Sequence, residues 1–181
     1  MVAIDGAVIA NDTVLLRAFP PVAKPNARIL ILGSMPSAAS LAAQQYYAHP
    51  RNAFWSILAT ITGVAASAPY NERLSGLMDA RFALWDVLQG CERKGSLDSA
   101  IVDATSVTND FAFFISEHPY LERVVFNGAK AEQCFRRQVL LPQSMCDALE
   151  FRRVPSTSPA HASWSFQRKL EAWRDALCFD E

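Results

Sequence analysis

The chain has 181 residues, of which 51% are hydrophobic, and its formal net charge is −1. These values predict a single domain over 1–181, with the packing of 1–26 left open, and the near-zero charge argues against a large, sequence-blind basic surface for nucleic acid. No apolar run could span a bilayer, the N-terminus lacks a secretory pattern and the four cysteines lack the paired spacing of a metal site, so we expect a cytoplasmic protein.

The apolar residues predict strands that alternate with helices. Residues 28–32 are apolar without alternation, which is typical of a central parallel strand. A helix is expected after Asn52, because apolar residues recur on one face from Phe54 to Ile61, and Gly63 is suited to end it. Further helices are predicted over 70–80, 111–116, 130–139 and the segment with Phe166, Leu170, Trp173 and Leu177, and further strands or strand-like segments over 82–88, 124–126 and 151–154.

Three of these strands end in polar turns and are followed by helices. The turns are Gly33-Ser34, Asn127-Gly128 and the segment 156–159. Strand, loop and helix in repetition indicate parallel strands with right-handed crossovers, which bring such turns to one edge of the sheet. The sequence therefore predicts an α/β fold with a mainly parallel sheet, helices on both faces and one pocket at the carboxyl edge.

The most informative stretch for chemistry runs from Arg28 to Trp55. Its strand ends in a loop of small residues, at the position where open α/β sheets bind ligands. Tyr46 and Tyr47 then offer flat surfaces, and Asn52 offers both a hydrogen-bond donor and an acceptor. This combination suits a planar heteroaromatic ligand such as a nucleobase.

Each of these residues also has a plainer interpretation. Asn52 directly precedes a helix, and asparagine is among the best N-cap residues. Asn127 begins an Asn-Gly turn, and Phe54 and Trp55 suit the core. His161 lies beside small residues and is typical of an exposed or satisfied histidine.

Other catalytic motifs fit poorly. A serine hydrolase built from Ser34, Ser37 or Ser156 with His161 lacks the G-x-S-x-G elbow and an identifiable acid. The glycine-rich phosphate-binding motifs are also missing from the sequence.

Two strings in the first third of the chain carry a resemblance to a known family. Gly33–Ser37 and Tyr46–Trp55 together resemble the first motif region of the uracil-DNA glycosylase superfamily, most closely its hypoxanthine-DNA glycosylase branch. Cys91–Ser99, Phe126–Gly128 and Pro155–Ala160 continue the resemblance in the expected order. It implies a three-layer α/β/α sandwich with a short, mainly parallel sheet.

The resemblance also implies an activity. The protein is expected to be a monofunctional DNA glycosylase without a cofactor, which hydrolyses the bond between a sugar and a base flipped out of double-stranded DNA. It is further expected to act as a monomer in base excision repair, nucleoid-associated when bound to DNA and without a membrane partner.

The same resemblance assigns roles to individual residues. Asn52 and Ser34 are the expected catalytic residues, Tyr47 is the aromatic that stacks on the base, and Asn127 reads a base edge. Met35 and Phe54 complete the expected base-binding set. The expected DNA-binding loop consists of Ser156, Thr157, Ser158, Pro159, Ala160 and His161.

Three positions depart from the wider superfamily. Met35 stands where many members carry a water-activating Asp or Asn, Ser156 replaces an Asn or His, and His161 replaces an Asn. The first two changes fit the hypoxanthine branch and lower the expectation of strong uracil excision. The leading hypothesis is therefore removal of hypoxanthine, and the alternatives are removal of uracil, thymine or xanthine, or a catalytically inactive nucleic-acid binder.

Overall fold

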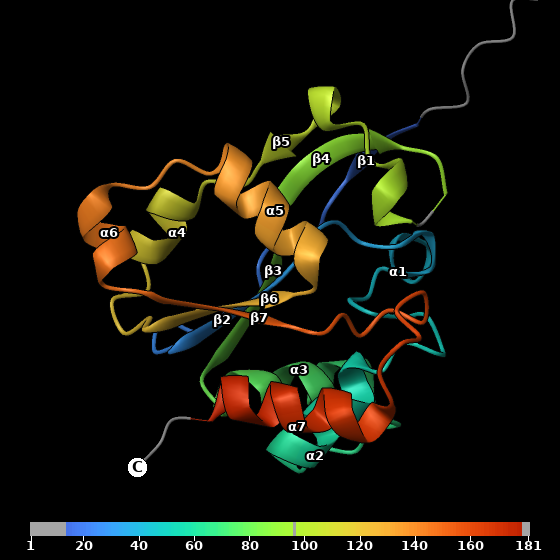
Figure 1. Ribbon diagram of the computed structural model, residues 1–181. Helices are drawn as coiled ribbons and strands as arrows, with labels where there is room; N and C mark the ends of the chain where they lie inside the picture. The colour runs from blue at the N-terminus through green and yellow to red at the C-terminus, as the bar shows by residue number, and fades with distance from the viewer. Residues whose placement is uncertain (1–13, 96, 179–181) are drawn as a thin grey trace, which may run out of the picture.

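The computed structural model describes residues 14–95 and 97–178 as a layered α/β structure (Figure 1). The larger sheet is parallel, with strand order β3-β2-β6-β7, and the smaller sheet is antiparallel, with order β1-β4-β5. The strands of the larger sheet are β2 (Ile29–Gly33), β3 (Phe82–Asp86), β6 (Arg123–Asn127) and β7 (Glu150–Val154). Those of the smaller sheet are β1 (Val14–Arg17), β4 (Leu88–Arg93) and β5 (Val107–Thr108).

Helices cover both faces of the parallel sheet (Figure 1). The face covered by α2 (Phe54–Thr62), α3 (Tyr70–Asp79) and α7 (Phe166–Leu177) is purely helical. The opposite face carries α4 (Phe111–Ser116), α5 (Ala129–Gln138) and the smaller sheet. The remaining α-helices are α1 (Ala38–Ala43) and α6 (Gln143–Asp147), and two short 3-10 helices cover Asp98–Ala100 and Asp103–Thr105. No helix in the described ranges is long and apolar enough to cross a membrane.

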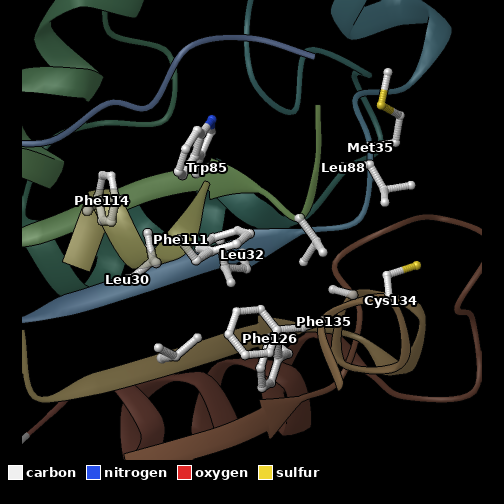
Figure 2. Close-up of a cluster of buried hydrophobic side chains, with 14 of the residues drawn as sticks. Leu30, Leu32, Met35, Trp85, Leu88, Phe111, Phe114, Phe126, Cys134 and Phe135 are labelled. Carbon is white, nitrogen blue, oxygen red and sulfur yellow. The ribbon is translucent and has the colours of Figure 1, made fainter. Parts of the chain in front are cut away.

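Alternate residues of the central strands supply two cores. Leu30 and Leu32 of β2 pack in the cluster around Phe111, Phe126 and Phe135, part of which Figure 2 shows. The intervening residues Ile29 and Ile31 pack with α2, α3 and α7 instead. All four side chains are fully buried. Burial of one such side chain is worth about 1.5–3 kcal/mol, so the run from 29 to 32 anchors both layers.

The prediction of an α/β sandwich with a mainly parallel sheet is confirmed, and the helix after Asn52 ends at Gly63 in the left-handed conformation, as expected. The segment 82–88 differs from the prediction. It is not one strand, because β3 ends at Asp86 and β4 begins at Leu88 in the other sheet. The apolar pattern continues where the chain passes from one sheet to the other, because Val87 and Leu88 are also fully buried.

Candidate active site

A cavity of about 330 Å³ opens at the carboxyl edge of the parallel sheet. The ends of β2, β3 and β6 form one side of it, at Gly33, Asp86 and Asn127. The loop after β2, the loop before α2, the loop after β4 and the loop after β7 enclose the rest. Its size lies within the range of small-molecule sites, and its position is the one expected for an open parallel sheet.

Nearly all of the residues predicted from the sequence line this cavity. Only Phe54 and Pro159 do not. The residues that do are Ser34, Met35, Tyr47, Asn52, Asn127, Ser156, Thr157, Ser158, Ala160 and His161.

Tyr47 presents its ring to the cavity from a constrained position. Its backbone is left-handed, with φ 54°, and its ring stacks on Phe54 with centroids 4.0 Å apart. Phe54 is fully buried, so the expectation that it contacts a base directly does not fit this geometry. Phe54 instead supports one face of Tyr47, which leaves the other face as the surface available to a planar ligand.

The buried hydroxyl of Tyr47 lies near the Asn127 side chain but forms no hydrogen bond of normal geometry with any described residue. Burial, with the Asp86 carboxyl as a second cause, raises the pKa of this phenol far above its ordinary value. Tyr47 is therefore neutral and can act as a hydrogen-bond donor at the bottom of the cavity.

The Asn52 side chain bonds to the N-terminus of α2, although Asn52 is not the N-cap residue that its position suggested. The N-cap of α2 is Ala53, and the Asn52 side-chain oxygen accepts a hydrogen bond from the Phe54 backbone N–H at 3.0 Å. The side chain thus satisfies one helix N-terminal donor while it lines the cavity. Its Nδ2 group donates to no other described residue. The amide therefore offers the cavity two donors, while one lone pair of its oxygen is already occupied.

Asn127 holds the loop after β7 in place. Its Nδ2 donates to the Thr157 hydroxyl at 2.9 Å, and its oxygen accepts from the Thr157 backbone N–H at 2.9 Å. Thr157 is almost fully buried, and its carbonyl accepts from the Ala53 N–H at 3.0 Å. One N–H of Asn127 and one lone pair of its oxygen remain for a ligand, so the reading of a base edge by this amide stays a prediction.

Helix α7 fixes the two ends of the same loop. The Trp173 indole N–H donates to the Pro155 carbonyl at 3.0 Å, and the Lys169 ammonium donates to the His161 carbonyl at 2.7 Å. Trp173 is fully buried and Lys169 is nearly so. With the clamp at Thr157, the loop from 155 to 161 is anchored along its length before any ligand binds.

Two glycines allow the close approaches that shape the cavity. Gly128 has φ +95°, and a Cβ there would lie 2.9 Å from the Ser156 Cβ, so a side chain would push the loop away. A Cβ on Gly33 would lie 2.4 Å from an Asp86 carboxyl oxygen and 3.0 Å from the Tyr47 hydroxyl. The absence of that side chain gives the carboxyl and the phenol room to lie side by side over the end of β2.

Two acidic residues that were not predicted as site residues line the cavity. Asp98 accepts a hydrogen bond from the Ser34 hydroxyl at 2.6 Å, and burial raises the pKa of the Asp98 carboxyl. Asp86 is 3% exposed, and one of its carboxyl oxygens has no hydrogen-bond partner in the described chain. Burial, reinforced by repulsion from Asp98 and partly offset by Arg93, raises the pKa of Asp86 to about 8. Asp86 is therefore mainly neutral at pH 7.

These contacts limit what the serine and the arginine can do. The Ser34 proton is directed to Asp98, away from any nucleophilic role. Arg93 is buried, and its guanidinium donates to the carbonyls of Pro36 at 2.5 Å and Gly95 at 2.9 Å, which joins two of the loops around the cavity. Asp98 could have been found from the sequence, since it belongs to the string Cys91–Ser99, but no polar turn marks Asp86.

Comparisons with known proteins agree with this architecture. The model of the uracil DNA glycosylase superfamily matches residues 20–177. A hypoxanthine DNA glycosylase from Methanosarcina acetivorans is 36% identical over 156 residues, which are 86% of this chain and 94% of that protein. Another from Methanosarcina barkeri is 40% identical over 116 residues, which are 64% of this chain and 72% of the relative.

A solved structure shares the fold as well. It is the solution NMR structure of a uracil DNA glycosylase candidate from Methanosarcina acetivorans, with a TM-score of 0.75 and 35% identity. The match covers 91% of this chain and 97% of the other.

Proposed function

The chain belongs to the uracil DNA glycosylase superfamily and is a DNA glycosylase, and we propose that the base it removes is hypoxanthine. Two relatives with that name support the choice of base. The observation that carries the proposal is the convergence of Tyr47, Asn52 and a buried neutral carboxyl in one preformed cavity. Such a set can hold a planar, uncharged base by stacking and by hydrogen-bond donation.

The base must leave the duplex to reach this cavity. A glycosidic bond inside the base stack is inaccessible, so the nucleotide rotates outward and its base enters the pocket. The free face of Tyr47 then stacks on the base, while Phe54 packs against the opposite face and holds the tyrosine ring in position. Stacking of this kind is worth about 1–3 kcal/mol per base.

The Asn52 amide contributes through its donors. As the glycosidic bond breaks, electrons move onto the base, and positively polarised N–H groups stabilise that charge. The same N–H groups can instead hold the attacking water by its oxygen. Because Phe54 N–H fixes the oxygen of Asn52, the donors are oriented before the substrate arrives.

The loop from 156 to 161 is the proposed contact with the DNA backbone beside the flipped nucleotide. The hydroxyl oxygens of Ser156 and Ser158 accept bonds from backbone N–H groups of the loop at 3.2 and 3.3 Å, so their own O–H groups can donate to phosphate oxygens, which accept many of the hydrogen bonds in protein–DNA complexes. Its anchoring by Asn127, Lys169 and Trp173 means that little further ordering is needed on binding.

The residues near the sugar favour hypoxanthine over uracil. Met35 lines the cavity with an apolar side chain, and the Ser34 proton is committed to Asp98, so neither residue activates water as a base would. We expect slow excision of uracil, because efficient uracil excision in the superfamily uses a water-activating residue at the position of Met35, and we assign the water to Asn52 in the removal of hypoxanthine. Removal of hypoxanthine, the product of adenine deamination, would place the protein in base excision repair.

The decisive assay uses duplex oligonucleotides with one deoxyinosine, deoxyuridine, deoxyxanthosine or G·T mismatch, followed by alkali to break the strand at any abasic site. We expect cleavage chiefly at deoxyinosine. Faster cleavage at another base would reassign the substrate, and binding without cleavage at any base would make the protein an inactive binder.

A further inference from the structure

Asp86 has an arrangement that the roles given so far do not use. It ends β3 beside Gly33 of β2, lines the cavity and is almost completely excluded from solvent. One of its carboxyl oxygens forms no hydrogen bond within the described chain. A buried carboxyl with an unused oxygen in a ligand cavity is a costly feature unless a ligand completes it.

The backbone of Asp86 is held by its neighbours. The Asn109 side chain donates to the Asp86 carbonyl at 2.8 Å, and the register of β2 with β3 pairs Asp86 with Gly33. The backbone that carries the carboxyl is therefore held in place where β3 ends at the cavity.

Burial is the main cause that favours the neutral form of this carboxyl, and the surrounding charges act in both directions. Asp98 faces it from the loop after β4 and repels a negative charge, and Arg93 of β4 attracts one. The Nε and Nη2 groups of Arg93 donate to backbone carbonyls, and no ion pair joins this guanidinium to Asp86 within the described ranges. The remaining titratable groups near Asp86 are the phenols of Tyr46, Tyr47 and Tyr70, which are neutral at pH 7.

We propose that the neutral carboxyl of Asp86 donates a hydrogen bond to N7 of the bound hypoxanthine and transfers its proton there as the glycosidic bond breaks. This inference rests on the proposed function, because it requires a purine in the cavity. It makes Asp86 a catalytic residue beside Asn52, and it gives a reason for purine preference, since a pyrimidine has no ring nitrogen equivalent to N7.

The step balances as follows. The C1′–N9 bond breaks with its electron pair moving to the base, and the Asp86 proton moves to N7, so the base leaves as its neutral N7–H tautomer. Water adds its oxygen to C1′ of the oxocarbenium ion and loses a proton, which restores the Asp86 carboxyl through solvent. The net reaction consumes one water and needs no other reactant. A neutral leaving group lowers the charge that Asn52 has to stabilise.

The test measures the single-turnover rate of base release from deoxyinosine and from 7-deazadeoxyinosine across pH 5.5–9.5, a range chosen on either side of the carboxyl pKa of about 8. Wild type, Asp86→Asn and Asp175→Asn are compared. Asp86→Asn keeps the size and a hydrogen-bond donor but has no proton to transfer. Asp175→Asn makes the same change at a side chain that is 87% exposed, on the face of the sheet covered by α7.

With deoxyinosine, we expect the wild-type rate to be flat at low pH and to fall about tenfold per pH unit well above the carboxyl pKa, because the protonated form is active. Asp86→Asn should be about 100-fold slower at pH 7 and insensitive to pH, as is typical when a general acid is lost. With the 7-deaza substrate, wild type should be slow and Asp86→Asn no slower. Asp175→Asn should match wild type throughout.

Three results would overturn the inference. One is a wild-type rate that rises with pH, since the carboxylate would then be the active form. Another is an Asp86→Asn rate within about threefold of wild type while thermal melting shows a folded protein. The third is an equal loss in Asp86→Asn on both substrates. In each case hypoxanthine excision still stands, whereas no release of hypoxanthine by wild type would defeat the proposed function and this inference together.

Discussion

Asn52 can be tested so that its capping role and its catalytic role separate. In Asn52→Asp, the carboxylate keeps the oxygen that accepts from Phe54 N–H, but both amide donors are lost. Asp is as good a cap as Asn, and a negative charge at a helix N-terminus is favourable by about 0.3–1 kcal/mol. We therefore expect unchanged or slightly raised stability, with turnover reduced about 100-fold or more, the scale of losing one preorganised donor.

Asn52→Ala completes the comparison, because it loses the hydrogen bond from Phe54 N–H as well as the donors. Its turnover should fall as far as that of Asn52→Asp, while its free energy of unfolding should fall by about 1 kcal/mol. A loss of this size lowers the melting temperature by about 2–4 °C in a protein of this length. Asp110→Ala is the matched control, because Asp110 caps α4 through a bond from Phe113 N–H at 2.9 Å and does not line the cavity.

The assay is single-turnover release of hypoxanthine, paired with thermal melting of each variant. Asp110→Ala should show the stability loss of Asn52→Ala with wild-type turnover. The reasoning would be refuted if Asn52→Asp kept wild-type turnover, or if turnover followed melting temperature across all three variants. Either result would leave Asn52 with a structural role alone.

Three further predictions concern the surroundings of the cavity. Tyr47→Ala should weaken binding of inosine-containing DNA by about 1–3 kcal/mol in a fluorescence titration, and an unchanged affinity would mean that the ring does not stack on the base. Gly128→Ala should lower the free energy of unfolding by about 1–3 kcal/mol in urea, because φ is +95° and the added Cβ meets Ser156; wild-type stability would show that the loop yields freely. The pKa of Asp86 is higher in the folded protein than in the unfolded chain, so the folded protein keeps this proton at pH values where the unfolded chain has lost it. The contribution of Asp86 to the free energy of unfolding should therefore fall as pH rises from about 4 to 8. Asp86→Asn should lessen that decline between pH 5 and pH 8, and an identical decline in both proteins would contradict the raised pKa.

The elements predicted correctly are those in which the residue types depend on burial or on an unusual backbone conformation. The run from 29 to 32 has no polar residue because helices cover both faces of its sheet, and Gly63 ends α2 because it tolerates a left-handed backbone. The smaller sheet was missed for a related reason. Its outer strands β1 and β5 lie at the surface, where Leu15 and Val107 are more than half exposed, and β5 has only two residues.

The sequence predicted which loops form the candidate site, but not the hydrogen bonds between its residues. Turns after strands and the family resemblance indicated which loops would meet, and these loops do line one cavity. Hydrogen-bond partners across the fold are not encoded locally, so the commitment of Asn127 to Thr157 could not be inferred. Asp86 was missed because its strand passes into the next through buried Val87, without the polar turn that marks the other strand ends.

The anchored loop from 155 to 161 determines which molecule deforms during recognition. A segment already held by β6, α2 and α7 has little conformational freedom left to lose, so the distortion of the complex falls on the nucleic acid. Discrimination would then begin before any contact with the base, in the free energy needed to open a pair. Weakly paired inosine opens more readily than an intact pair, and the same lesion should be excised at different rates according to the base opposite it. The ease with which a damaged base pair opens would then set the selectivity, because the preordered loop around the cavity does not adjust to the DNA.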